Sequence, residues 1–165
     1  MNNEDNRSPE RKKLRLVNYD YSTSGAYFIT ICTKDRKMLF GTTGEASYAK
    51  MIIEKSYLDI INSNDGIDSP IYVIMPNHFH AVITIKRADT RSAPTISDIV
   101  RSFKSKSTLE YIKAVEEKRA LPFEKQLWQR SFYDHIIRNP DEYNEICKYI
   151  FENPKNWEHD ELNTN

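Results

Sequence analysis

A short connection between two apolar runs constrains the fold more than any other part of the chain. The stretch IYVIMPNHFHAVITIKR (71–87) holds two runs rich in aromatic and β-branched residues, separated only by Pro76, Asn77 and His78. Such runs are typical of strands, and parallel strands need a crossover of a dozen residues or more. We therefore expect strands over 71–75 and 80–87 that pair antiparallel, in an antiparallel sheet.

Other elements follow from the spacing of apolar residues. Three further segments have the composition of extended chain: AYFITICT (26–33), MLF (38–40) and LWQRSFYDHII (127–137). The short MLF segment is placed to pair back on the strand before it. Apolar residues at helical spacing between Ile53 and Ile61 predict a helix over about 46–62.

Two further helices begin at capping signals. Thr95, with Asp98 three residues later, matches a capping box and predicts a helix that starts there. Asn139, followed by Pro140 and two acidic residues, predicts a last helix that ends near Asn153.

The predicted order is strand, strand, helix, strand, strand, helix, strand, helix. This order predicts an α+β fold in which two helices cover an antiparallel sheet, like a ferredoxin-like or RRM-like core, with a C-terminal helix added. A chain of 165 residues is long enough for one such domain. We expect a single domain over 11–165, preceded by a disordered tail over 1–10.

The composition predicts a cytoplasmic protein and leaves nucleic-acid binding open. The sequence has no apolar run of about 18 residues and no secretion signal, so we expect no membrane span. A net charge of zero gives no argument for nucleic acid. Basic residues nevertheless gather at RKKLR (11–15) and between 86 and 106, although such clusters are often only solvated surface.

Two of the four histidines, His78 and His80, stand one residue apart in the hairpin. Alternate residues of a strand point to the same face, so the two imidazoles are expected side by side. This arrangement suits two ligands of one metal ion, because neutral imidazole is a common metal ligand. Both can also be ordinary strand histidines. A metal site needs a further donor, for which His135 and His159 are candidates.

The last predicted helix offers another donor. Tyr149 and Asn153 are four residues apart, hence on one face of the helix. Taken alone, Tyr149 is explained by packing and Asn153 by a C-terminal cap before Pro154.

Five stretches in order carry a family resemblance: GAYFITICT, IYVIMPNHFHAVI, ISDIVRSFKSKS, LWQRSFYDHIIRN and YIFENPKNW. Together they resemble the single-tyrosine HUH transposases of the insertion-sequence type, most closely the REP-associated tyrosine transposases. The resemblance covers about residues 11–158. Each motif is weak by itself, whereas their order and spacing are specific.

The resemblance implies a metal site and a nucleophile. His78-Phe79-His80 is the histidine-hydrophobe-histidine motif that names the superfamily, and with Asn153 it would bind a divalent metal, Mg²⁺ or Mn²⁺. Tyr149 on the C-terminal helix would be the nucleophile, and its attack on one DNA strand would give a phosphotyrosine and a free 3′-hydroxyl.

Two other tyrosines compete with Tyr149 as the nucleophile. Tyr133 lies in the predicted extended segment and Tyr143 in the first turns of the last helix. Neither has a fitting amide or acid one helical turn later. Tyr133 is kept as the main alternative.

The implied function is that of a DNA transposase that cleaves and rejoins single-stranded DNA beside hairpins, as a monomer or homodimer. The basic residues that would contact phosphates are Arg11, Lys12, Lys13, Arg15, Arg101, Lys104 and Lys106. Phe103 and Trp128 would be placed to stack on unpaired bases, although a core position suits Trp128 better.

Two alternative functions stay open. A metal-dependent phosphodiesterase that uses water would need no tyrosine. A nucleic-acid-binding module would need no chemistry, but the predicted strands lack the aromatic RNP pattern of such modules.

Overall fold

The computed structural model describes residues 24–41, 47–86 and 94–163. The strands and helices are β1 (Gly25–Cys32), α1 (Tyr48–Asn62), β2 (Ile67–Ile74), β3 (His78–Ile85), α2 (Ile96–Glu116), β4 (Tyr133–Ile137) and α3 (Pro140–Glu152), with the short 3-10 helices η1 (Lys34–Arg36) and η2 (Trp157–His159). The expected tail over 1–10 and the basic residues Arg11, Lys12, Lys13 and Arg15 lie outside the described ranges. No helix within those ranges is long and apolar enough to cross a membrane.

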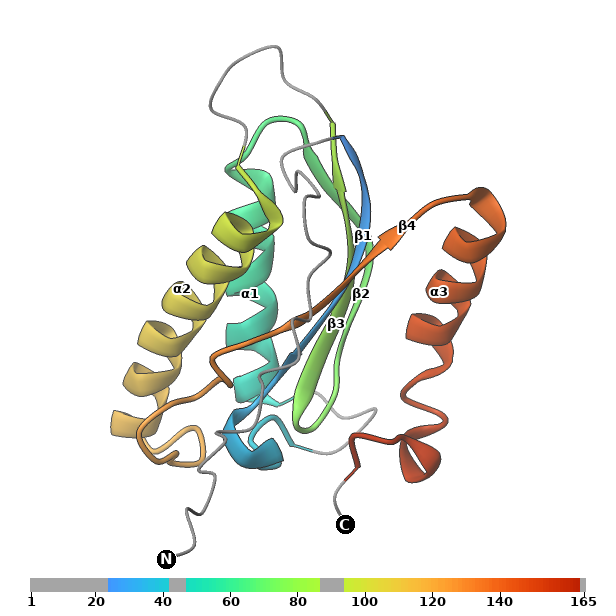
Figure 1. Cartoon of the computed structure of the whole chain (residues 1–165). Coiled ribbons are helices and arrows are strands. Elements are labelled where there is room, and N and C mark those ends of the chain that lie inside the picture. Colours follow the sequence, from blue (N-terminus) through green and yellow to red (C-terminus); the bar gives the residue numbers. More distant parts are fainter. Residues whose placement is uncertain (1–23, 42–46, 87–93, 164–165) are drawn as a thin grey trace, which may run out of the picture.

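The four strands form one antiparallel sheet in the order β2-β3-β1-β4, which confirms the predicted α+β fold (Figure 1). β2 and β3 form the predicted hairpin. β2 begins at Ile67, four residues before the predicted start at 71. The pairing of β2 with β3 is irregular between Asp68 and Ile71. Pro70 lies in this gap, and because it has no N–H it cannot donate to a regular ladder.

The prediction of a short strand over 38–40 is wrong. The segment runs under the hairpin, and the Phe40 N–H donates to the Pro76 carbonyl (3.0 Å). Leu39 and Phe40 are buried, and the Phe40 ring packs against Trp128 with 5.2 Å between ring centroids. The apolar side chains of residues 38–40 therefore reflect burial in the core and not pairing in a sheet.

Alternation along the strands gives the sheet two different faces. The core face packs against α1 and α2, which lie together on one side of the sheet (Figure 1). Phe79 of β3 belongs to this face, and its ring contacts Tyr57 of α1 (4.7 Å) and Phe103 of α2 (5.1 Å). The opposite face, called here the site face, carries the intervening residues, among them Thr30 of β1 and His80 of β3.

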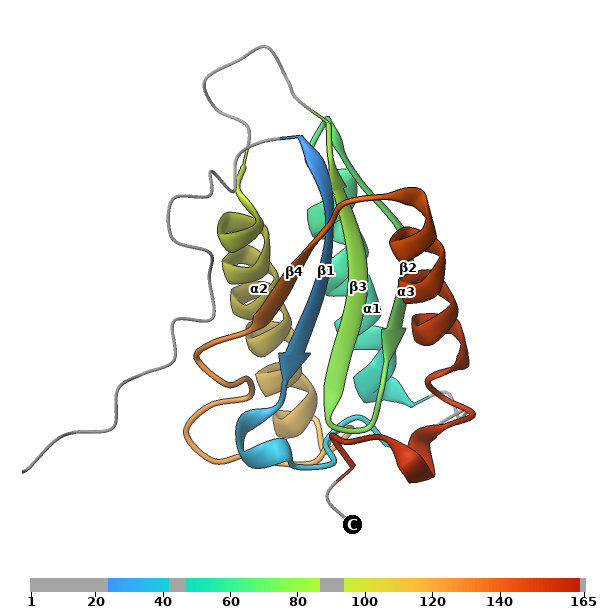
Figure 2. The ribbon, with the colours of Figure 1, turned by 45° about the vertical axis from the view of Figure 1, so that its right-hand side comes forward.

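α3 lies on the site face and packs mainly against β2 and β3, whereas β1 and β4 lie farther from it (Figure 2). The helix begins as predicted: the Asn139 side chain accepts from the Glu142 N–H (2.9 Å), with Pro140 in the first turn. Ile150 is its buried residue. α3 thus covers one half of the site face and leaves the β1–β4 half accessible.

Replacing Phe79 with alanine should destabilise the protein by about 3–5 kcal/mol, because a fully buried ring is lost from the centre of the core. Urea unfolding followed by tryptophan fluorescence measures the change. Phe151→Ala is the matched control, because Phe151 is 69% exposed on α3 and its loss should change stability by less than about 0.5 kcal/mol. Equal destabilisation by the two substitutions would contradict this assignment of the core.

Candidate functional site

The strand register brings His78 and His80 beside two residues of β1. Cys32 pairs with His78 and Thr30 with His80. Both histidines are buried, and their ring centroids are 4.5 Å apart. The imidazoles therefore lie side by side on the site face, as their spacing predicts.

Hydrogen bonds select which nitrogen of His78 is available to a ligand. The Asn77 Nδ2 group donates to the carbonyls of Arg36 (3.3 Å) and Leu162 (2.7 Å), so Asn77 Oδ1 faces His78 Nδ1 at 2.8 Å. An amide oxygen can only accept, hence Nδ1 carries the proton. Nε2 is then an unprotonated, buried lone-pair donor, and it has no hydrogen-bond partner among the described residues.

His80 is held between β1 and α3. Its Nδ1 lies 2.8 Å from Thr30 Oγ1, and its Nε2 lies 3.3 Å from Tyr149 Oη. Burial, reinforced by neighbouring His78, lowers the pKa of His80 well below its usual value. Burial also lowers the pKa of His78 to about 4, although the Asp160 carboxylate opposes this shift. Both rings are neutral at neutral pH, the form in which imidazole binds metals.

Asn153 follows α3 directly and joins Asp160 in a polar cluster with the histidines. Its Nδ2 donates to Asp160 Oδ2 (2.7 Å). Its Oδ1 is buried and has no hydrogen-bond partner within the described part of the chain. One donor atom from each of His78, His80 and Asp160 lies within 4.8 Å of the others.

These residues fit a divalent cation. A buried polar atom without a partner costs free energy, and His78 Nε2 and Asn153 Oδ1 are two such atoms in neighbouring side chains. Imidazole nitrogens suit transition metals, and amide and carboxylate oxygens suit Mg²⁺ and Mn²⁺. The ligand set expected from the sequence, His78, His80 and Asn153, therefore gains Asp160 as a candidate.

Asp160 was missed by reasoning from the sequence. The segment after α3 turns back under the hairpin, where the Trp157 ring lies 5.9 Å from that of His78 and the Leu162 carbonyl accepts from Asn77. No periodic pattern marks this segment. Its one signal is an acid seven residues after Asn153, which acquires meaning only through these long-range contacts.

The remaining two histidines do not join this cluster. His135 Nε2 lies 2.6 Å from Glu142 Oε1, between β4 and the first turn of α3. His159, on η2, is exposed. Among the described residues, the group of potential metal ligands contains neither of them.

Tyr149 stands at the edge of the cluster, with 46% of its surface exposed. Its ring lies 5.4 Å from that of His80 and packs edge-on against Phe28 at 6.1 Å. Partial burial, together with the acidic Asp160 and Glu161, raises the pKa of Tyr149. The hydroxyl is therefore protonated at neutral pH, and it is still reachable from solvent.

The two competing tyrosines are attached to the backbone at other places, away from His80 and from Tyr149. Tyr133 of β4 pairs with Thr30 of β1, which in turn pairs with His80 of β3. Its backbone thus lies two strands away from His80, or about 10 Å at the usual strand spacing. Tyr143 precedes Tyr149 by six residues of α3, or about 9 Å along the helix axis.

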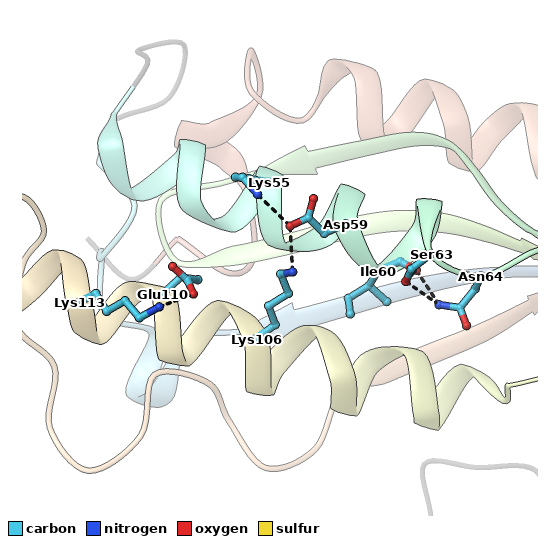
Figure 3. A network of polar contacts seen from close by, with 8 residues as sticks. All are labelled: Lys55, Asp59, Ile60, Ser63, Asn64, Lys106, Glu110 and Lys113. Carbon is cyan, nitrogen blue, oxygen red and sulfur yellow. Dashed lines mark hydrogen bonds and ion pairs between the residues drawn. The ribbon is translucent and has the colours of Figure 1, made fainter.

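Lys106 of α2, expected to contact phosphate, has a partner within the fold. Its Nζ lies 2.9 Å from Asp59 Oδ2 of α1, which also accepts from Lys55 (2.9 Å), as Figure 3 shows. Figure 3 also shows the nearby pair of Lys113 and Glu110. The Lys106–Asp59 pair links α2 to α1, and the Lys113–Glu110 pair lies on α2 itself. Both pairs are on the opposite side of the sheet from the histidines.

Lys104 and Arg101 of α2 are also paired. Lys104 Nζ donates to the three consecutive carbonyls of residues 129–131, at 2.8, 3.2 and 3.0 Å. Arg101 pairs with Asp98 on its own helix and is exposed. Of the three basic residues expected on α2, Arg101 is the most exposed, and Lys104 and Lys106 are partly buried.

The two aromatic residues considered for base stacking are both core residues. Phe103 is 1% exposed, so the expectation that it stacks on bases is wrong. Trp128 is buried as expected, and its Nε1 donates to Ser107 Oγ (2.9 Å).

Comparison with known proteins defines a class of DNA transposase. The family model described as IS200-like transposase matches residues 21–153, and the chain belongs to this family. Membership implies a role in DNA transposition.

The relatives that match this chain include a named transposase and an uncharacterised protein. A REP-associated tyrosine transposase of Escherichia coli is 23% identical over 134 residues, which cover 81% of this chain and 68% of that protein. An uncharacterised protein of Haemophilus influenzae is 33% identical over 177 residues, which cover 92% of each chain.

Two solved structures share the fold. One is a REP-associated tyrosine transposase bound to a REP hairpin, with a TM-score of 0.64, 20% identity and coverage of 87% of this chain and 74% of that chain. The other is a transposase-like protein of Deinococcus radiodurans, with a TM-score of 0.53, 18% identity and coverage of 84% and 95%.

Mn²⁺ should bind the metal-free protein, and His78→Ala or Asn153→Ala should weaken this binding at least about tenfold, because each removes a donor that is otherwise buried without a partner. Isothermal titration calorimetry measures the affinity without any DNA. His135→Ala is the matched control, since it removes an imidazole outside the cluster and should bind Mn²⁺ normally. Normal binding by His78→Ala would exclude a metal site here.

Proposed function

We propose that this protein cleaves and rejoins single-stranded DNA beside a hairpin, in a metal-dependent reaction that passes through a covalent phosphotyrosine on Tyr149. One observation carries the proposal: the Tyr149 hydroxyl lies 3.3 Å from His80 Nε2, at the edge of the donor cluster. A nucleophile must be held within reach of the phosphate that the cluster positions. Membership in the IS200-like transposase family supports DNA as the substrate.

A divalent metal, Mg²⁺ or Mn²⁺, would polarise the scissile phosphate and offset the charge that develops on it. The two imidazoles would hold it through their Nε2 atoms, with Asn153 Oδ1 and the Asp160 carboxylate on the helix side. Asn77 and Thr30 would orient the rings through hydrogen bonds to their Nδ1 atoms.

Tyr149 would form the new bond. Its oxygen would attack phosphorus, the bond to the 3′ oxygen of the preceding nucleotide would break, and that oxygen would leave as a 3′-hydroxyl after gaining a proton. The raised pKa of Tyr149 means that its own proton must be lost during the attack. The covalent link conserves the phosphodiester energy, so a 3′-hydroxyl can later attack the phosphotyrosine and rejoin the strand.

Hairpin DNA is proposed because a solved structure with the same fold is described as a transposase bound to a REP hairpin. Arg11, Lys12, Lys13 and Arg15 are proposed to contact its phosphates. On α2, Arg101 is retained as a phosphate contact because its pair with Asp98 lies on one exposed turn, whereas Lys104 holds residues 129–131 and Lys106 links α2 to α1.

Two other functions predict different results. A phosphodiesterase that uses water would nick DNA without a protein adduct and would be indifferent to Tyr149→Phe. A binding module would hold hairpin DNA in the presence of EDTA and would cleave none.

Tyr149→Phe should abolish covalent trapping of a labelled single-stranded hairpin in Mn²⁺ while leaving its binding intact, because the ring stays and only the nucleophilic oxygen is removed. Denaturing gels and mass spectrometry detect the adduct, and EDTA should prevent its formation.

Tyr143→Phe is the matched control on the same helix and should still form the adduct. Trapping that survives in Tyr149→Phe and disappears in Tyr133→Phe would instead assign the nucleophile to Tyr133.

Deleting residues 1–15 should flatten the salt dependence of hairpin binding. The deletion removes Arg7 and the four proposed contacts, and loss of those four contacts to a single strand would reduce the slope of log K against log salt by up to about 3. Fluorescence anisotropy at several salt concentrations measures this slope for the full chain and the deletion. An unchanged slope would show that the basic residues of 11–15 make no contact with the DNA.

A further inference from the structure

An open cavity of about 640 Å³ extends over the site face from the donor cluster of His80, Asn153 and Asp160 toward β4. Its polar end is lined by His80, Asn153 and Asp160, and its aromatic end by Phe28, Phe132 and Tyr133. Tyr149 lies between the two ends. A volume of this size is typical of cavities that hold a small ligand, so there is room for more than the reacting phosphate.

The aromatic end is built on the half of the sheet that α3 leaves accessible (Figure 2). Phe28 of β1 contacts Tyr149 edge-on (6.1 Å, 87°) on one side and Tyr133 of β4 edge-on (6.2 Å, 69°) on the other. Tyr133 is 47% exposed. A ring surface is thus presented to solvent next to the nucleophile.

Hydrogen bonds hold the backbone that precedes the aromatic end of the cavity. Lys104 donates to the carbonyls of residues 129–131, immediately before Phe132 and Tyr133. Its Nζ also lies 5.7 Å from the centre of the Phe132 ring. A half-buried lysine with three backbone acceptors fixes this segment and therefore the position of both rings.

The charge of the cavity indicates which part of a nucleotide fits there. No lysine or arginine is among the described residues that line it, whereas Asp160 and Glu161 are. The side chains that line the aromatic end are uncharged, so they offer a backbone phosphate no counter-charge. An uncharged, planar group is the complementary ligand, and in DNA that group is the base.

We propose that Tyr133 stacks on the base of an unpaired nucleotide that adjoins the scissile phosphate, with Phe28 supporting the Tyr133 ring edge-on. This inference rests on the proposed function, because it places that phosphate at the histidines. Stacking accepts every base, since each has a π-face. Gln129 and Ser131 line the same cavity and offer polar groups to the base edge. Tyr133 is then a binding residue, with a role separate from that of Tyr149.

The test uses Tyr149→Phe protein, which does not cleave, and a fluorescein-labelled REP-type hairpin with single-stranded flanks. An abasic residue is placed at each flank position in turn, and affinity is measured by fluorescence anisotropy in Mn²⁺. One abasic position should weaken binding. Tyr133→Ala should weaken binding of the intact hairpin about 5- to 150-fold and should remove the effect of that abasic position.

Tyr133→Phe keeps the ring and should restore both the affinity and the abasic effect. Phe28→Leu keeps apolar volume without the ring, and in this variant the same abasic position should no longer weaken binding. Phe151→Ala removes an exposed aromatic residue outside the cavity and should retain the wild-type profile. Unchanged Mn²⁺ affinity checks that each variant is folded.

An abasic effect that persists in full in Tyr133→Ala overturns the inference, as does an unchanged affinity for the intact hairpin. The adduct assay with Tyr149 intact separates this failure from failure of the proposed function. An adduct together with a persistent abasic effect rejects stacking and keeps the nucleophile. If the abasic effect disappears in Tyr133→Ala but no adduct forms with Tyr149 intact, stacking is kept and covalent catalysis is rejected.

Discussion

The burial of β3 on both of its faces is the constraint on which the rest of the structure depends. Phe79 packs between α1 and α2, while His78 and His80 on either side of it point to the opposite face. One strand therefore supplies the centre of the core and two ligands of the candidate metal site. A shift of one residue in its pairing would exchange the two sets and destroy both at once. The stability of the core thus maintains the geometry of the site.

The donors around these histidines come from elements far apart in the chain. β1 supplies Thr30, the end of α3 supplies Asn153, and the segment after α3 supplies Asp160. The helix that carries Tyr149 packs mainly against β2 and β3, and an open cavity lies on the site face beside β1 and β4. A buried donor cluster beside an open surface suits chemistry at one phosphate of a polymer that extends beyond the protein.

Features that depend on neighbouring residues were predictable from the sequence, and features that depend on tertiary contacts were not. The hairpin followed from its short connection, and two helix starts followed from capping at Thr95 and Asn139. The same apolar signal misled at 38–40, where burial in the core replaces pairing. The partner of Lys106 lies on another helix, and Asp160 reaches the histidines through contacts that span more than 80 residues. Neither position carries a local pattern.

The amide of Asn77 connects the segment after α3 to the protonation of one nitrogen of His78. Its orientation depends on the Leu162 carbonyl, and it determines which nitrogen of His78 is unprotonated. Leu162 and Asp160 both lie beyond residues 21–153, the part shared with the family. At the proposed metal site, substitutions in this last segment would therefore change metal affinity while residues 21–153 stay unchanged. The metal concentration that the proposed reaction needs would then be set in part by residues outside the region that defines the family.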